Sequence, residues 1–180
     1  MNLTEEQLVK LCLEKDARAQ KQLFDYYSKR MMGVCLRYAQ DADEANDVLQ
    51  LGFIKVFEKL NMYNAQGSLE GWIRKIIVNT ALDTIRKNKK YQNDVEMDKV
   101  DYQLHQHGES PIQSLSAQDL LKIIQEMPPG FKTVFNMFAI EGYSHKEIAE
   151  ELNISVNTSK SQYSRARAYL QKIIIEEKVL

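Results

Sequence analysis

The helical spacing of apolar residues is the feature that most constrains this chain. Apolar side chains recur at three- and four-residue steps from Leu8 to about residue 89, and again from residue 116 onward. Only seven glycines and three prolines occur in 180 residues, which disfavours hairpin-rich β folds because their turns depend on those residues. No strand pairs are recognisable. The sequence therefore predicts an all-α protein.

The predicted helices fall into two groups separated by one aperiodic stretch. They cover residues 8–12, 23–35, 43–60, 72–89, 116–127, 131–141, 144–152 and 156–177. Asparagines and glycines between residues 61 and 71 indicate a loop. Residues 96–115 hold one lysine against four acids and lack helical periodicity. We expect two small helical domains, residues 1–92 and 116–180, joined by a flexible acidic linker over residues 93–115.

Composition excludes several classes of protein. The hydrophobic fraction of 44% is too high for a disordered chain. The longest apolar run covers residues 31–36, whereas a membrane helix needs about 20 residues. Acids among the first twenty residues argue against a signal peptide, and Cys12 and Cys35 have no CxxC spacing. We expect a soluble, cytoplasmic protein.

Basic residues gather in two segments of a chain whose net charge is only −1. Residues 72–90 hold six bases against one acid, and residues 155–172 hold four bases and no acid. Two basic segments indicate two separate contacts with a polyanion, or else two solvated helix faces. The near-neutral total argues against strong autonomous binding of nucleic acid.

Residues 144–170 carry the sharpest local pattern. Ser144 and Glu147 form a capping box, and Ile148 begins the apolar face of a short helix. Asn153 tolerates the left-handed conformation of a tight turn, and Ser155 can cap the following helix. This pattern is typical of a helix-turn-helix, whose second helix enters the major groove of DNA.

The second helix of this pattern separates its side chains by chemistry. Tyr163, Ala166, Leu170 and Ile173 share the face expected to be buried. The opposite face is small, polar and basic, as groove and phosphate contacts require. It carries Asn157, Ser161, Ser164, Arg165 and Ala168, with Lys160 at its flank. The alternative is an ordinary helical hairpin with a polar exterior.

The helix predicted over residues 72–89 carries a second polar stripe. Its members lie at helical steps and are Lys75, Asn79, Asp83, Arg86 and Lys87. Tyr63 and Asn64 lie in the loop before it. An aromatic ring and an amide beside a basic helix suit the binding of unstacked bases in single-stranded DNA. Trp72 is more simply explained as a core residue.

In their order along the chain, these patterns resemble the extracytoplasmic-function sigma factors of the sigma-70 family. The resemblance covers roughly residues 20–172. Residues 47–53, DVLQLGF, are similar to the family's region 2.2, and residues 72–87, WIRKIIVNTALDTIRK, are similar to regions 2.3 and 2.4. Four short segments are similar to region 4. They are MPP at 127–129, GYS at 142–144, EIA at 147–149 and SRAR at 164–167.

The resemblance implies a non-catalytic transcription initiation factor without a cofactor or metal. Its partners would be promoter DNA, the clamp helices and flap of core RNA polymerase, and an anti-sigma factor, soluble or membrane-anchored. The free chain would be a monomer. The −35 element would be read by Asn157, Thr158, Lys160, Ser161, Ser164, Arg165 and Arg167. The −10 element would be captured and melted by Tyr63, Asn64, Arg74, Lys75, Asn79, Asp83, Arg86 and Lys87. Polymerase would be contacted by Asp47, Gln50, Leu51 and Ile54, with Phe53 packed inside.

The chain departs from the family pattern at two positions. Leu51 stands where many members carry an acid, and Ser159 stands where the recognition helix often has a buried valine. Leu51 can still anchor an interface if it is exposed. Ser159 can either bond back to a backbone carbonyl or loosen its helix.

Two other classes of protein are alternatives. A self-sufficient helix-turn-helix regulator should dimerise, but the sequence shows no sustained heptad seam. A small helical enzyme would need a metal site or a nucleophile–base pair, and His105, His107, His145 and the two cysteines form neither pattern.

Overall fold

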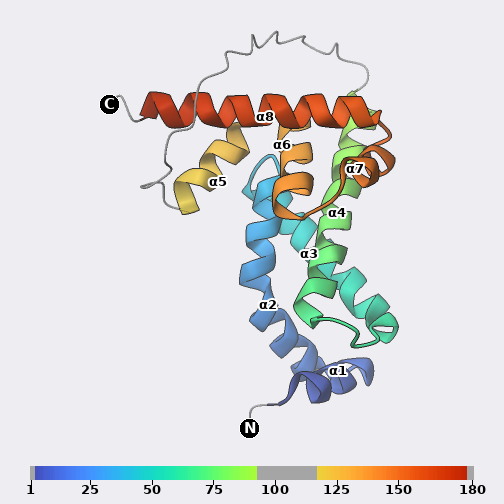
Figure 1. The fold of residues 1–180 in the computed structure, drawn as a ribbon. Coiled ribbons are helices and arrows are strands. Elements are labelled where there is room, and N and C mark those ends of the chain that lie inside the picture. Colours follow the sequence, from blue (N-terminus) through green and yellow to red (C-terminus); the bar gives the residue numbers. More distant parts are fainter. Residues whose placement is uncertain (1–2, 93–116, 178–180) are drawn as a thin grey trace. The chain divides into compact units, whose positions relative to one another are not determined.

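The structure, a computed structural model, describes residues 3–92 and 117–177. Every regular element in these two ranges is a helix, which confirms the predicted fold class (Figure 1). The chain separates into two compact units, residues 1–90 and 91–180. The predicted acidic linker, residues 93–115, lies outside the described residues.

The first unit contains four α-helices and one short 3₁₀-helix. They are α1 (Glu5–Leu13), α2 (Ala17–Tyr38), α3 (Ala42–Lys59), η1 (Leu60–Met62) and α4 (Leu69–Gln92). Side-chain oxygens of Thr4, Asp16 and Asp41 accept backbone N–H groups at the starts of α1, α2 and α3. These caps satisfy amide groups that a helix leaves without an internal partner, and so fix where each helix begins.

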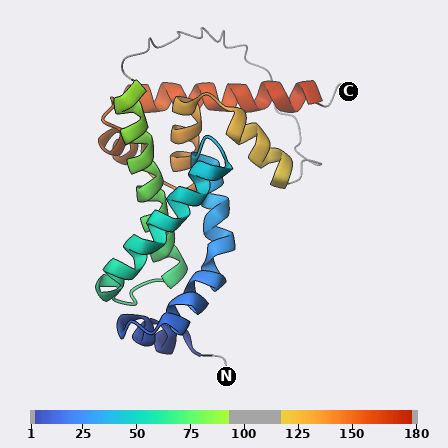
Figure 2. The same ribbon diagram turned by 180° about the vertical axis from the view of Figure 1, so that it is seen from behind.

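Helices α2, α3 and α4 run side by side and bury one apolar core (Figure 2). Leu23 and Met31 from α2, Val56 from α3 and Ile77 from α4 are fully buried within it. Phe53 is 2% exposed and packs edge-to-face on the Phe24 ring, with 4.8 Å between ring centroids, so its predicted inward position is confirmed. Such a ring pair contributes specific geometry beyond the area that it buries.

Helix α4 begins at Leu69, three residues before the predicted start at Trp72. The reason is local: the Ser68 hydroxyl accepts a hydrogen bond from the Gly71 amide at 3.1 Å, which caps the first turn. Gly71 therefore lies inside the first turn of the helix and not in the preceding loop. The loop itself is correspondingly short, from Tyr63 to Ser68.

The second unit packs three short helices against one long one. They are α5 (Ala117–Glu126), α6 (Pro129–Phe135), α7 (His145–Leu152) and α8 (Val156–Glu177). Each of the short helices contacts α8. Their shared core includes the buried side chains of Ile124, Met127 and Ala166.

The predicted helix over residues 131–141 differs in both its start and its geometry. Pro129 occupies the first turn of α6. Proline is favoured there because the N–H group that it lacks would have no hydrogen-bond partner inside the helix. After Phe135 the helix widens into a π-helical turn, η2 (Asn136–Ile140). Its backbone bond runs from the Glu141 amide to the Asn136 carbonyl at 2.9 Å. π-Turns are rare, and apolar periodicity does not distinguish them from α-helix.

Helices α3 and α4 approach each other closely at Gly52. A Cβ atom at this position would lie 2.3 Å from Cδ1 of Ile77, which is fully buried. Gly52→Ala should therefore overpack the interface and lower the free energy of unfolding by about 1–3 kcal/mol. The measurement is urea denaturation of the full chain.

Gly33→Ala is the matched control, because a Cβ atom at Gly33 in α2 would meet nothing within 4 Å. This variant should be stabilised by roughly 0.5–1 kcal/mol through helix propensity. Equal effects of the two substitutions would contradict the close approach at Gly52.

Candidate nucleic-acid interface

Residues 144–156, which cover α7, the turn after it and the start of α8, are folded in the predicted way. The Ser144 hydroxyl accepts the Glu147 amide at 3.2 Å, and the Glu147 carboxylate accepts the Ser144 amide at 2.8 Å. Asn153 ends α7 in the left-handed conformation with φ 52°. The Ser155 hydroxyl accepts the Thr158 amide at 2.9 Å and caps α8. All four features were predicted, and together they confirm the helix–turn–helix geometry.

The polar side chains predicted on α8 lie along an exposed stripe. The exposed members are Asn157, Lys160, Ser161, Ser164, Arg165 and Arg167. Thr158 is half-buried, and its hydroxyl lies 2.8 Å from that of Ser155. Ser159 and Ala166 are fully buried and hold the opposite face of the helix. The stripe thus combines hydroxyl, amide and basic groups that can reach base edges and phosphates together.

Tyr163 belongs to the face predicted to be buried, but it is only half-buried. Its ring lies 4.5 Å from Phe138 and 5.9 Å from His145, measured between centroids. The ring therefore joins α8 to η2 and to the start of α7. Through these contacts Tyr163 holds α8, and with it the exposed stripe, against η2 and α7.

The departure at Ser159 is explained by a polar partner on the other helix of the turn. Its hydroxyl lies 2.9 Å from Nδ1 of His145, the first residue of α7. The hydroxyl is thus paired between helices in place of the apolar contact that valine would make. Sequence reasoning treated His145 only as a neighbour of the cap and missed this contact.

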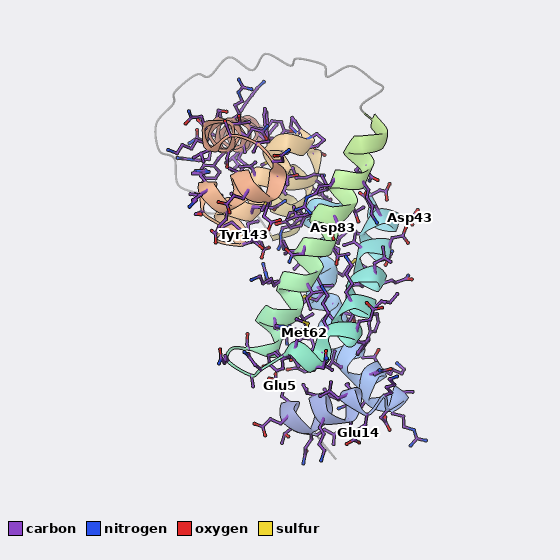
Figure 3. All side chains as sticks on the ribbon, turned by 90° about the vertical axis from the view of Figure 1, so that its right-hand side faces the viewer. Glu5, Glu14, Asp43, Met62, Asp83 and Tyr143 are labelled. Atoms are coloured by element: carbon purple, nitrogen blue, oxygen red, sulfur yellow. The ribbon has the colours of Figure 1, made fainter. Side chains whose placement is uncertain are left out.

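The residues predicted to bind DNA on α4 differ in their exposure. Lys75, Asn79, Arg86 and Lys87 are exposed, whereas Arg74 and Asp83 are half-buried. Figure 3 labels Asp83 on α4. Its carboxylate lies 2.8 Å from the Arg86 guanidinium and 3.1 Å from the Lys55 ammonium of α3. Asp83 therefore partly neutralises two neighbouring cations.

The loop before α4 is braced by its own side chains. The Tyr63 hydroxyl donates to the Gly67 carbonyl at 2.7 Å, and its ring centroid lies 5.5 Å from that of Trp72. Trp72 is half-buried and so is neither a free platform nor a fully buried core residue. Asn64 is exposed, and its side-chain Oδ1 accepts a hydrogen bond from the Gln66 backbone amide at 3.2 Å.

Helix α1 lies at the same end of the unit as this loop. Figure 3 shows Glu5 of α1 close to Met62, which immediately precedes Tyr63. The Tyr27 hydroxyl of α2 donates to the Glu5 carboxylate at 3.1 Å. Burial and the Glu5 charge raise the pKa of Tyr63, so its hydroxyl stays protonated and able to donate to Gly67 at neutral pH.

The outward face of α3 presents apolar as well as polar groups. Asp47 and Gln50 are exposed, and Leu51 and Ile54 are 50% and 54% exposed. Exposed aliphatic side chains flanked by polar ones are typical of a protein-binding surface. The four residues predicted to contact polymerase therefore form one accessible surface.

Neither cysteine has the features of a catalytic or metal-binding residue. Burial raises the pKa of Cys12 to about 11 and that of Cys35 to about 12, so both thiols are protonated at neutral pH. Among the residues that the structure describes, no group of three or more His, Cys, Asp or Glu side chains could hold a metal ion. His105 and His107 lie outside those residues.

None of the helices within residues 3–92 and 117–177 combines the length and apolar character that a membrane span requires.

Two family models match this chain, one in its N-terminal part and one in its C-terminal part. Sigma-70 region 2 matches residues 23–91, and Sigma-70 region 4 matches residues 117–170. The chain belongs to the sigma-70 family, whose region 2 and region 4 domains bind promoter elements and core RNA polymerase. Within that family it is an extracytoplasmic-function sigma factor, a non-enzymatic initiation factor.

Curated relatives match over nearly the whole chain. The RNA polymerase sigma-H factor of Pseudomonas aeruginosa is 28% identical, with 96% of each chain covered. The sigma factor SigW of Bacillus subtilis is also 28% identical, with 91% of this chain and 93% of the relative covered.

Solved structures support the fold. The sigma factor RpoE, in complex with the anti-sigma factor NepR from Bartonella quintana, has a TM-score of 0.52 at 22% identity. That match covers 86% of this chain and 95% of RpoE. CnrH, in complex with the cytosolic domain of CnrY, has a TM-score of 0.50 at 18% identity and covers 94% of this chain and 96% of its own.

The ion pairs of Asp83 lead to a testable expectation. Asp83→Asn removes a carboxylate that pairs with Lys55 and Arg86, so the local positive charge rises and the assembled holoenzyme should bind single-stranded DNA more tightly. The slope of log K against log salt should steepen by up to about 1. Because these ion pairs are partly exposed, the free energy of unfolding should change by less than about 1 kcal/mol.

Asp25→Asn is the control, since Asp25 pairs with Lys21 at 2.6 Å within α2 and is equally an acid-to-amide change. An identical salt slope for wild type and Asp83→Asn would show that these cations do not approach phosphate.

Proposed function

We propose that this chain directs core RNA polymerase to promoters through three helices, each of which makes a separate contact. Helix α8 reads the −35 element as duplex, α4 and its preceding loop capture the −10 element as an open strand, and α3 docks on the clamp helices. The observation that carries the proposal is the exposed polar stripe on α8, presented by a capped turn with a buried opposite face.

The α8 stripe supports major-groove reading through its composition. Asn157 and Ser161 offer short hydrogen-bonding groups, while Lys160, Arg165 and Arg167 supply positive charge. Residues 155–172 contain no acid, so this part of α8 presents no carboxylate to DNA phosphates; Glu176 and Glu177 lie at its far end. Short groups at the helix start can approach base edges while the longer ones reach the backbone.

The −10 assignment is supported by the pairing of an ordered loop with a basic helix. Tyr63 is held by Gly67 and Trp72, and Asn64 is exposed beside it. Lys75 and Asn79 are exposed on the first turns of α4, and the basic residues Arg86 and Lys87 follow. A pre-formed aromatic and amide edge with nearby cations can hold unstacked bases and their phosphates.

The polymerase assignment is supported by the exposed aliphatic pair on α3. Leu51 and Ile54 would lie against the clamp helices, with Asp47 and Gln50 providing polar contacts. The second unit would contact the polymerase flap. Residues 1–92 and 116–180 would act as separate domains, and the acidic residues 93–115 would tether them. Two modest DNA contacts on one tether gain affinity through effective concentration.

An anti-sigma factor, soluble or membrane-anchored, is the natural regulatory partner in this proposal. A structural neighbour was solved with an anti-sigma factor, which supports it. The exposed aliphatic residues of α3 and the stripe of α8 are surfaces that such a partner would cover. We further propose that the chain acts in the cytoplasm and is a monomer when free of partners.

The decisive test is capture of core RNA polymerase by the purified chain, run beside a duplex shift assay without polymerase. Capture of polymerase with little free duplex binding is expected. Tight duplex binding by a dimer, with no capture of polymerase, would instead establish a self-sufficient regulator.

Arg165→Ala should weaken promoter binding by the holoenzyme through the −35 element by about 1–3 kcal/mol, the scale of a base contact. Lys172→Ala is the control, because it removes the same charge from an exposed site two turns further along α8. Competition between an intact promoter and one with a scrambled −35 element provides the measurement. Equal losses on both DNAs would show that Arg165 contributes charge without reading sequence.

Asn79→Ala should spare polymerase binding and impair promoter opening, because Asn79 lies exposed on the strand-capturing side of α4. Ile54→Asp is the reciprocal variant and should reduce capture of core polymerase by placing a charge in an apolar contact. Permanganate reactivity of the promoter bubble and polymerase pull-down separate the two effects. Wild-type bubble reactivity with Asn79→Ala would remove this residue from the interface.

A further inference from the structure

A fully buried polar side chain lies where the two helices of the helix–turn–helix meet. Ser159 is 0% exposed, and its hydroxyl is 2.9 Å from Nδ1 of His145. The two residues are fourteen positions apart and belong to α8 and α7 respectively. This contact is therefore tertiary, and it joins the first turn of α7 to the first turn of α8.

The imidazole of His145 is fixed on its other sides by aromatic rings. It stacks on Phe138 of η2 with a centroid distance of 4.2 Å and an interplanar angle of 12°. Tyr163 of α8 lies edge-on to it at 5.9 Å and also packs on Phe138. Because η2 and α8 both hold this ring, its Nδ1 atom has a defined direction toward Ser159.

We propose that His145 is a positioning residue that sets the rotation of α8 about its own axis relative to α7. The proposal rests on the function proposed above for α8. The buried side of α8 offers two small, fully buried anchors, Ser159 and Ala166. Small side chains permit sliding and rotation, whereas a hydrogen bond depends on both distance and angle. The Ser159 contact thus supplies the directional restraint for the first turns of the helix.

The consequence falls on the exposed side of the same turns. Asn157, Lys160 and Ser161 lie within two residues of Ser159 in sequence, so any rotation of α8 at Ser159 moves them together. A base contact tolerates little displacement because its hydrogen bonds weaken steeply with angle. Loss of the restraint should therefore reduce discrimination between promoter sequences more than it reduces general affinity for DNA.

The protonation state of His145 offers a second readout. Burial and the Lys160 charge lower the pKa of His145, and Tyr163 is the other titratable group facing it from α8. Phe138 of η2 adds no charge, and on α7 the Glu147 carboxylate is engaged in the cap. Because the unfolded chain takes up the proton first, acidification below the ordinary histidine pKa of about 6.5 removes stability from the wild type. Variants without His145 should lack this contribution.

The test uses holoenzyme assembled with three variants of the full chain. His145→Phe keeps a ring against Phe138 and loses the hydrogen bond, whereas His145→Asn keeps a polar atom near Nδ1 and loses the ring. Ser159→Ala removes the hydroxyl. The readout is the ratio of affinities for an intact promoter and one with a scrambled −35 element, recorded beside urea unfolding of each chain.

His145→Phe and Ser159→Ala should each reduce that ratio about fivefold or more, and the double variant should be no worse than either single one. His145→Asn should lose less of the ratio than His145→Phe, because it keeps a polar atom for Ser159, but it should not restore the wild-type ratio, because its amide lacks the ring contacts that hold the imidazole. An unchanged ratio in His145→Phe, or additive losses in the double variant, would overturn the positioning role. A variant with lower stability but an unchanged affinity ratio would overturn it as well. Absence of any −35 preference in the wild type would overturn the proposed function as well.

Discussion

The first unit depends on how closely α3 and α4 can approach. Gly52 allows the Ile77 side chain to lie against the α3 backbone, and two polar contacts flank this crossing. Lys55 pairs with Asp83 at 3.1 Å, and the Asn88 amide donates to Glu44 at 2.7 Å. The helix proposed to bind polymerase and the helix proposed to bind DNA therefore belong to one packed body. Close-packed cores transmit displacement because they have few voids to absorb it.

Local sequence rules were sufficient where a structure depends on residues a few positions apart. The capping box at Ser144 and the left-handed turn at Asn153 were both predicted, since each is set within one or two helical turns. The start of α4 was predicted three residues late because Gly71 was interpreted as part of a loop. The π-turn of η2 was not predictable, because apolar periodicity does not distinguish a π-helical turn from an α-helical one.

The candidate site was partly predictable for the same reason. Exposure of the polar stripe on α8 follows from helical periodicity, and so does the inward position of Phe53. The ion pair of Asp83 with Lys55 and the contact of His145 with Ser159 join residues 28 and 14 positions apart. No periodic pattern records such pairs, although a serine at a position expected to be apolar was a signal that a polar partner should be sought.

A buried polar contact is a costly way to join two helices if stability alone is considered. The hydroxyl of Ser159 and the imidazole of His145 both lose water when they meet, and an apolar pair of similar volume would avoid that loss. An apolar pair, however, holds its partners equally well over a range of rotations. In a helix whose exposed side must match the edges of base pairs, orientation matters more than a small gain in stability. The same reasoning explains why the surrounding rings of Phe138 and Tyr163 clamp the imidazole. A hydrogen bond can fix a helix only if its own donor and acceptor are fixed first.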